Sequence, residues 1–439
     1  MESLLSRIEP FFTFQQPLLA VVLVTLLALL GGYYRFRVFP LLGKKLPPRS
    51  LGFPLVGQAG SKFIFSANDA LGSNQPVSVA RILRPESIQR FVGEMDAIVK
   101  EQLLQELKGK DSVQVVTMMK KVTFKVTCSL LFGLPEGKEK DALLEDFTIA
   151  LKGAWAIPID FPGTIFRQTC QTRDRITTVI TKLVERRKKE MEEGKEAPRE
   201  DVISSFLNLR DEEDQSLTKD EMIDNIVSMI IASHDTSAIV LSLLLRHLAG
   251  DTHVYEAVLE EQTEISKTKE GKDGMLRWSD VEKMKYTWRV AQELMRVTPP
   301  VFGNFKSTKD TSFGGFDIPK GWQVFWIACA THMDEKIFEE PEKFDPSRFG
   351  NPSKSAPPYT YIPFGAGPRA CPGVDFARIE MMLILRHLII NSKWTELIPD
   401  EAITREPMPY PAMGLPIKLH PRKDICWFNV IPSLCTEQN

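Results

Sequence analysis

The feature that most constrains this chain is a single cysteine in a glycine-rich turn. Cys371 lies within residues 364–373, after an apolar run and directly before a helix-like segment at residues 374–380. Glycines allow the backbone to approach a sulfur closely and to direct N–H groups at it. The N-terminus of the following helix would place partial positive charge near the sulfur, so the pattern predicts that the thiolate form is favoured. A thiolate at the end of an apolar pocket is a ligand suited to iron.

The turn resembles the cysteine-loop signature of the cytochromes P450. Five residue types match within ten positions, namely Phe364, Gly367, Arg369, Cys371 and Gly373. The resemblance implies that Cys371 ligates the iron of a haem, that Arg369 faces a haem propionate and that Phe364 packs near the sulfur. Gly367 and Gly373 would belong to the same haem-binding loop. The alternative is that Cys371 is a small buried hydrophobe, as free cysteines usually are.

Composition limits the other functions that this chain can have. Its 439 residues are enough for one large domain or two ordinary ones, and 43% apolar with 26% charged residues is typical of a globular protein. A formal net charge of −2 gives no reason to expect a nucleic-acid partner. The six cysteines show no paired spacing, which argues against a disulfide framework and against a zinc or iron–sulfur site. This cysteine usage fits a reducing compartment.

The N-terminus predicts a membrane anchor. Residues 18–34 form an apolar run broken only by Thr25, near the lower limit of the roughly 17–25 residues that a spanning helix needs. Basic residues follow directly, so the positive-inside rule places residues 1–17 in the lumen and the rest of the chain in the cytosol. The alternative, a cleaved signal peptide, would have its basic residues first and a small-residue cleavage site.

A hinge is expected after the anchor, at residues 35–57. Its second part holds three prolines, which prevent a helix and favour an extended, fairly stiff connector. The resemblance implies that such a hinge joins the anchor to a catalytic domain, predicted here at residues 58–422.

Helical patterns dominate the rest of the chain. We expect helices at residues 85–107, 116–131, 143–151 and 177–193. A Gly-Gly pair within residues 312–318 predicts a hairpin, and the apolar run at residues 322–327 predicts a buried strand. The predicted fold class is therefore mainly α with a small β-sheet region, as in the P450 fold. It would form a single large domain behind an N-terminal transmembrane helix.

A long central helix is predicted from Thr218, where a capping box with Glu221 marks its start, to about Gly250. Its apolar sequence is interrupted by polar residues that include Asp235 and Thr236. Polar groups within a buried helix are costly unless they find partners, although hydroxyls can bond back to the preceding turn. An acid beside an alcohol in an apolar groove is harder to explain in that way.

The resemblance assigns a catalytic role to this acid–alcohol pair. In P450s such a pair helps deliver protons during oxygen activation; Asp235 and Thr236 match it, and Ala232 matches the small residue before it. Ser233 stands where the family usually has glycine, so the helix distortion that opens the oxygen groove is expected to be smaller. His234 falls at a variable position, and we expect it to line the pocket or lie at the surface.

A charge triad is the third predicted feature. Glu293 and Arg296 lie three residues apart on a probable helix, which puts them on one face as an ion pair. The segment containing Arg348 resembles the family's second arginine motif, which completes a buried triad with the helix pair. Its implied role is structural, because it holds the region that carries the cysteine loop.

The resemblance extends from the hinge to Leu419. The phrases at residues 284–288, 318–322 and 414–419 are similar to the plant P450s that oxidise terpenoids and sterols, with triterpenoid oxidases and taxane hydroxylases nearest. It implies a haem b cofactor (iron protoporphyrin IX), electrons from NADPH through NADPH–cytochrome P450 reductase, and an apolar small-molecule substrate. It also implies a single-pass protein of the endoplasmic reticulum membrane with a cytosolic catalytic domain.

Two departures from the family leave alternatives open. The segment between residues 57 and 84 is shorter than in the family and lacks the propionate-binding helix, and residues 423–439 extend beyond the family's usual end. The first hypothesis is a haem-thiolate monooxygenase, with pocket walls near Ile231 and near residues 299–304 and 412–413. The second is a defective relative with impaired haem binding that acts as an interaction protein or has no role. The third, a reductase-independent isomerase or dehydratase, is disfavoured by the acid–alcohol pair.

Overall fold

The chain divides into two compact units. One combines Met1–Phe53 with Asn304–Trp326, and the other combines Pro54–Gly303 with Ile327–Asn439. The computed structural model describes Val24, Leu83 and residues 85–154, 156, 159–194, 201–210, 214–267, 275–300, 303–350, 356–367, 370–405 and 408–422. The predicted anchor (Val24 apart), the hinge, the shortened segment (Leu83 apart) and the C-terminal tail lie outside the described residues, as does Arg369.

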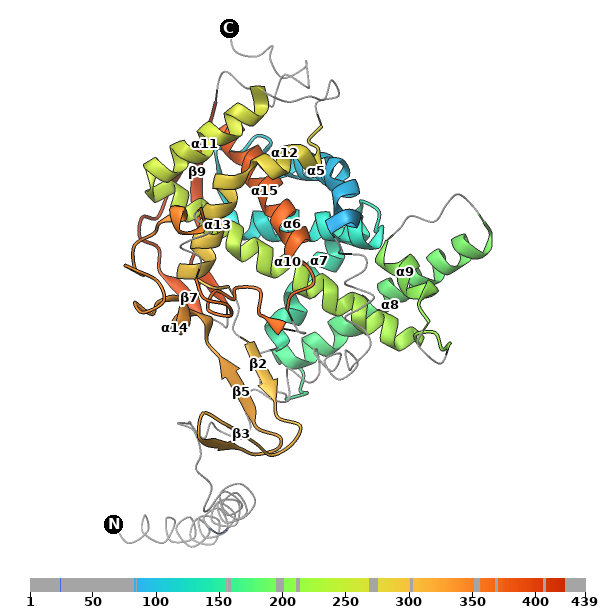
Figure 1. Ribbon diagram of the computed structural model, residues 1–439. Coiled ribbons are helices and arrows are strands. Elements are labelled where there is room, and N and C mark those ends of the chain that lie inside the picture. The colour runs from blue at the N-terminus through green and yellow to red at the C-terminus, as the bar shows by residue number, and fades with distance from the viewer. Residues whose placement is uncertain are drawn as a thin grey trace, which may run out of the picture. The chain divides into compact units, whose positions relative to one another are not determined.

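The second unit is mainly helical (Figure 1). Its described helices are α5 (Pro85–Leu107), α6 (Val115–Phe132), α7 (Lys138–Ala154), α8 (Ile165–Glu192), α9 (Val202–Asn208), α10 (Lys219–Gly250), α11 (Thr252–Lys267), α12 (Trp278–Lys283), α13 (Lys285–Val297), α14 (Ala328–His332), the 3-10 helix η3 (Pro346–Phe349) and α15 (Val374–Asn391).

The sequence analysis predicted both ends of the first of these helices correctly and underestimated the length of others. The helix expected at residues 85–107 is α5, and the one expected at 116–131 is α6 with one residue more at each end. The prediction for residues 177–193 was too short, because α8 begins twelve residues earlier at Ile165. Thr164 caps this helix, with its hydroxyl accepting a hydrogen bond of 3.3 Å from the N–H of Arg167.

Small antiparallel sheets complete the described part of the second unit. The strand β9 (Pro416–Pro421) lies between β1 (Ser112–Gln114) and β6 (Ser392–Glu396), and β7 (Ile403–Arg405) pairs with β8 (Pro409–Pro411). These strands join the C-terminal region to the helices, because β1 directly precedes α6 and β6 directly follows α15.

In the first unit the structure describes two pairs of strands. β3 (Thr311–Phe313) and β4 (Phe316–Ile318) form the predicted hairpin, and its two glycines both have positive φ, +58° and +78°. This conformation, which glycine adopts without strain, suits a two-residue hairpin turn. β2 (Gly303–Lys306) pairs with β5 (Gln323–Trp326).

The strand predicted at residues 322–327 is present as β5 (Gln323–Trp326), but the prediction that it is buried was wrong. Val324 and Phe325 in β5 are 40% and 52% exposed. An apolar run reports the tendency of a segment to be buried, but burial also requires a surface that covers it. β5 belongs to a two-stranded sheet, which is too small to bury its own faces.

The helix α10 forms the centre of the second unit. It packs against α6, α8, α13 and α15 (Figure 1). The predicted capping box is present: the backbone N–H of Thr218 donates to Glu221 at 2.9 Å, and the backbone N–H of Glu221 donates to the Thr218 hydroxyl at 3.3 Å. Among the described helices α10 is the one long and apolar enough to cross a membrane, but 67% of its most apolar window is buried in the protein. Its apolar sequence is therefore that of a core helix.

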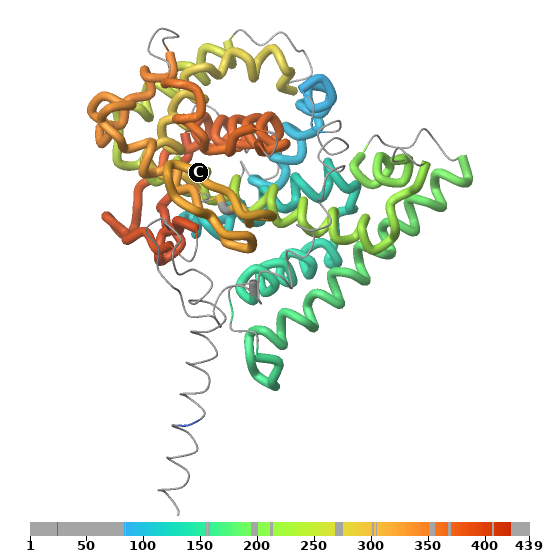
Figure 2. Tube along the Cα trace, turned by 60° about the horizontal axis from the view of Figure 1, so that its bottom comes forward, coloured from blue at the N-terminus to red at the C-terminus, as the bar shows by residue number. Residues whose placement is uncertain are grey.

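The cysteine loop is anchored to this core by α15. That helix begins one residue after Gly373 and packs against α5, α10 and α11. Figure 2 shows α5 in blue beside α15 in red. Most residues of α15 are buried, so the end of the helix that follows Cys371 is held by the centre of the fold.

Candidate active site

The cysteine loop has a defined hydrogen-bonded geometry. The N–H of Cys371 donates to the carbonyl of Phe364 at 2.8 Å, and the N–H of Ala370 donates to that of Gly367 at 3.0 Å. Gly365 and Gly367 both have positive φ, +73° and +70°, a conformation that side-chain-bearing residues rarely adopt. The two glycines therefore allow the chain to fold back so that Phe364 and Cys371 meet.

The surroundings of the Cys371 sulfur come from its own loop. Cys371 is an exposed residue, while the N–H of Gly373 donates to its sulfur and Phe364 packs against the hydrophobic core. Crowding by protein atoms raises the pKa of the Cys371 thiol, and the Gly373 hydrogen bond offsets this only in part. The expectation that the loop and the helix N-terminus favour the thiolate stays a prediction, and the Gly373 N–H is a donor of the kind that it requires.

The acid of α10 is held from two sides. Its carboxylate forms an ion pair of 2.8 Å with Lys120 of α6, and it accepts a hydrogen bond of 2.7 Å from the hydroxyl of Tyr410 in β8. The ammonium of Lys120 also lies 4.3 Å from the centre of the Tyr410 ring. Burial and the negative charge of Asp235 raise the pKa of Tyr410, so its hydroxyl remains a proton donor. Neither partner could be predicted from local sequence, because each lies more than a hundred positions away.

The alcohol beside this acid has a different neighbourhood. The hydroxyl of Thr236 donates to the carbonyl of Ala232 at 2.8 Å, one turn earlier, and Ala232 is exposed although α10 is mostly buried. Ser233 likewise donates to the carbonyl of Met229 at 2.6 Å, and α10 continues without interruption through this turn. An undistorted helix here agrees with the serine that replaces the family's glycine.

The structure corrects the expectation for His234. This residue is 1% exposed, and its ring meets Phe124 and Phe147 edge-on at 5.3 and 6.4 Å between ring centres. Its Nδ1 lies 2.7 Å from the carbonyl oxygen of Ile230, and burial lowers its pKa, so it is a neutral core residue. It directly follows the half-buried residue Ser233 along the helix, and a rotation of about 100° per residue directs its side chain into the core.

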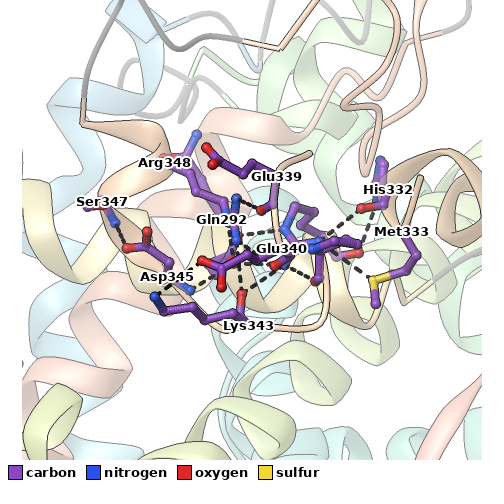
Figure 3. A network of polar contacts seen from close by, with 12 residues as sticks. Gln292, His332, Met333, Glu339, Glu340, Lys343, Asp345, Ser347 and Arg348 are labelled. Atoms are coloured by element: carbon purple, nitrogen blue, oxygen red, sulfur yellow. Dashed lines mark hydrogen bonds and ion pairs between the residues drawn. The ribbon is translucent and has the colours of Figure 1, made fainter. Parts of the chain in front are cut away.

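The structure brings Glu293, Arg296 and Arg348 together in one cluster, part of which is shown in Figure 3. The Arg296 guanidinium donates to both oxygens of Glu293 at 2.8 Å, and the side chains of both residues are fully buried. Arg348 adds a contact of 3.2 Å to Glu293, and the N–H of Asp345 adds one of 2.9 Å.

The remaining donors of the two arginines bind backbone carbonyls. Arg296 donates to the carbonyls of His332 and Pro341 at 2.9 and 2.7 Å, and Arg348 donates to that of Glu340 at 2.8 Å. The charges are therefore paired and their hydrogen-bonding capacity is used, which is what makes a buried ion cluster tolerable.

The sequence analysis did not single out two titratable residues that the structure buries. His332 is fully buried and links Arg296 to the segment that leads into the cysteine loop. Glu380 is fully buried in α15, next to the central helix, and burial raises its pKa well above the usual value. A single acid in the apolar run 379–385 was a detectable signal for Glu380, whereas nothing in the sequence around His332 marks its burial.

Comparison with known proteins decides the family. Residues 55–419 match the cytochrome P450 family. The chain is a cytochrome P450. This confirms the resemblance that the cysteine loop indicated, together with the mainly helical fold class.

Relatives of this P450 include plant triterpenoid oxidases. The chain is 39% identical over 342 residues to a beta-amyrin 28-monooxygenase of Kalopanax septemlobus, covering 78% of this chain and 70% of that protein. It is 37% identical over 395 residues to cytochrome P450 716A1 of Arabidopsis thaliana, covering 84% and 81%. Among solved structures, the retinoic acid-bound cyanobacterial CYP120A1 aligns with a TM-score of 0.74 and 27% identity, covering 90% of this chain and 88% of that one.

Membership of the family implies a haem cofactor, electrons from a reductase and a hydrophobic substrate. The residues present fit a haem. Cys371 is an exposed residue with an N–H donor at its sulfur, and Ala232 is an exposed residue of the central helix. At Gly367, an added Cβ would have no atom within 4 Å, so the space beside the loop is open.

Proposed function

We propose that this P450 is a haem-thiolate monooxygenase that oxidises an apolar triterpenoid or sterol. The observation that carries the proposal is the cysteine loop, in which a hydrogen-bonded turn holds the exposed residue Cys371 and the N–H of Gly373 donates to its sulfur. The beta-amyrin 28-monooxygenases among its relatives support a triterpenoid as substrate.

In this proposal Cys371 would ligate the iron of haem b. The Gly373 N–H would stabilise charge on the sulfur, Phe364 would shield it from water, and Arg369 would face a propionate. Haem, when bound, supplies the oxygen chemistry, in which one oxygen atom enters a C–H bond and the other becomes water.

Asp235 and Thr236 are proposed to take part in proton transfer. Both carboxylate oxygens of Asp235 are engaged, one by Lys120 and the other by Tyr410. To accept and pass on a proton, Asp235 must exchange one of these contacts for water or for the hydroxyl of Thr236. The side chain of Lys120 is 25% exposed, so its contact is the easier one to exchange.

The proposed cellular setting follows from the sequence. Residues 18–34 would anchor the protein in the endoplasmic reticulum membrane, with residues 1–17 in the lumen and the hinge at 35–57. The domain at residues 58–422 would take electrons from NADPH through NADPH–cytochrome P450 reductase, and the tail at 423–439 has no assigned role. Ile231 and residues 299–304 and 412–413 are proposed to line the substrate pocket.

The first experiment tests the thiolate. The protein is produced with haem supplied, and the difference spectrum of its reduced carbon monoxide complex is recorded. We expect a strongly red-shifted band, which Cys371→Ser abolishes. Cys170→Ser is the matched control, because Cys170 is a partly exposed free cysteine of α8 and its replacement should leave the band unchanged. A band that persists in Cys371→Ser would overturn the assignment, and failure to take up haem would support the defective-relative hypothesis.

The second experiment tests the reaction and the substrate class. The protein is reconstituted with the reductase and NADPH and supplied separately with beta-amyrin, a plant sterol and a taxane. We expect a monooxygenated product from beta-amyrin or the sterol that requires NADPH. Product formed without reductase would contradict the monooxygenase proposal.

A further inference from the structure

We propose that His332 is a positioning residue that fixes the loop carrying Cys371 to the charge cluster. The cluster is the set Glu293, Arg296 and Arg348. The inference rests on the proposed function, because it gives His332 a role through the haem ligand. The charge cluster does not contact the cysteine loop in any hydrogen bond described above, and His332 would provide the connection between them.

The two ring nitrogens of His332 face partners of opposite kind. Nδ1 lies 3.2 Å from the carbonyl oxygen of Arg296, and Nε2 lies 3.1 Å from the backbone nitrogen of Ile362. A carbonyl oxygen only accepts and a backbone N–H only donates. Nδ1 must therefore carry the proton and Nε2 must accept, so both contacts require one tautomer of the neutral ring.

On the helix side, the attachment is reciprocal. His332 donates to the backbone carbonyl of Arg296, while the Arg296 guanidinium donates to the backbone carbonyl of His332 at 2.9 Å. Because Arg296 is itself clamped by Glu293, the imidazole has a fixed support.

On the loop side, His332 holds the residue from which the cysteine turn starts. The carbonyl of Ile362 accepts the N–H of Gly365 at 3.0 Å, and Phe364 in turn accepts the N–H of Cys371 at 2.8 Å. Tyr361 strengthens the attachment, since its ring lies 5.4 Å from that of His332 and its hydroxyl donates to the carbonyl of Gln292 at 2.9 Å.

Burial makes this contact hard to replace by water. His332 is fully buried, and burial lowers its pKa, which keeps the ring neutral and Nε2 free to accept. The charged group that faces the ring is the Arg296 guanidinium, with Glu293 behind it. Without Nε2 the N–H of Ile362 would lack an acceptor in a water-poor place, and such a group is costly.

Two substitutions of His332 test the contacts of its two ring nitrogens separately. In His332→Gln the amide oxygen can occupy the place of Nε2 and accept from Ile362, whereas in His332→Asn the amide nitrogen can occupy the place of Nδ1 and only the contact to Arg296 is kept. The haem-loaded proteins are compared by amide hydrogen exchange of a peptide spanning residues 359–367, and by the fraction of the reduced carbon monoxide complex that shows the thiolate band.

We expect His332→Asn to exchange about fivefold to tenfold faster in this peptide, as the loss of one hydrogen bond implies, and to lose part of the thiolate band. His332→Gln should remain close to wild type in both measurements. His387→Asn is the matched control: it removes the contact of 2.6 Å between Nε2 and Asp96 near the far end of α15 and should not change this peptide.

Several results would overturn the proposal. These are unchanged exchange in His332→Asn, equal acceleration in His332→Gln, or equal acceleration in the His387→Asn control. If His332→Asn fails to fold, nitrogen NMR of wild-type protein labelled at histidine decides: protonated Nε2 on His332 would contradict the proposal. If wild-type protein shows no thiolate band, the proposed function fails, while hydrogen exchange and the tautomer still test the link.

Discussion

The charge cluster and the acid of α10 both place a carboxylate beside cations, but they are built differently. Glu293 accepts from two arginines and a backbone N–H, and its side chain is fully buried. Asp235 forms an ion pair with one lysine and accepts a hydrogen bond from one tyrosine, and the lysine side chain is partly exposed.

The difference lies in how many bonds hold each cation. Arg296 is fixed at several points, since its planar guanidinium binds Glu293 with two nitrogens and backbone carbonyls with the donors that remain. Lys120 carries a point charge on a flexible stem that reaches solvent. A cluster of the first kind fixes the backbone, whereas a pair of the second kind can open and close. The comparison therefore separates a structural use of charge from one suited to proton transfer.

The largest effect is expected from removing the carboxylate of the cluster. Glu293→Ala leaves the buried Arg296 and the half-buried Arg348 without their carboxylate partner, and we expect a loss of about 3–5 kcal/mol in the free energy of unfolding. Urea denaturation of the haem-loaded protein measures it. A loss below about 1 kcal/mol would show that Glu293 contributes no more than an exposed ion pair. The charge cluster would then not differ in stability from the Asp235–Lys120 pair.

Glu380 is the opposite case to Glu293, because it is a buried carboxyl with no good hydrogen-bond partner among the described residues. Burial raises its pKa well above 4.5, and the Ser237 hydroxyl offsets this only in part. Between 4.5 and its raised value the folded protein holds a proton that the unfolded chain releases, so this group's contribution to stability is lost as pH rises. Glu380→Gln should be more stable than wild type at neutral pH and equal to it below about pH 4.5.

The measurement is the free energy of unfolding of wild type and Glu380→Gln at several pH values between 4 and 8 (roughly the span over which a carboxyl with a raised pKa titrates). The difference between the two proteins should grow with pH. A constant difference would mean that Glu380 is ionised in the folded state, and an undetected partner would then be required.

The backbone pattern was largely predictable from the sequence, and the partners of the polar groups were not. The capping box at Thr218 and the helix from Pro85 depend on neighbours within a few positions, so local rules sufficed. Lys120 and Tyr410 reach Asp235 from a helix and a strand that are distant in sequence. His332 is held through backbone groups, which every residue has and which no sequence motif reports.

A smaller effect is expected at the partner of Asp235. Tyr410→Phe removes one hydrogen bond to a charged group but leaves the Lys120 pair in place, so the free energy of unfolding should fall by about 1.5 kcal/mol. Because the freed oxygen of Asp235 would be open to water, we expect the turnover number to change more than the substrate KM. Equal changes in both would indicate that Tyr410 shapes the pocket and does not position the acid.

The smallest effect is expected at an exposed pair beside the cluster. Lys343 lies 3.4 Å from Glu340, and both side chains are more than 60% exposed, although the backbone carbonyl of Lys343 accepts from Arg296 and Arg348. Lys343→Met keeps that carbonyl and removes only the surface charge, so the free energy of unfolding should change by less than about 0.5 kcal/mol. Urea denaturation at low and at high salt measures the change beside that of Glu293→Ala. A loss above about 2 kcal/mol would mean that charge near this segment is stabilising regardless of burial, and the contrast between a buried, fully bonded cluster and an exchangeable pair would fail.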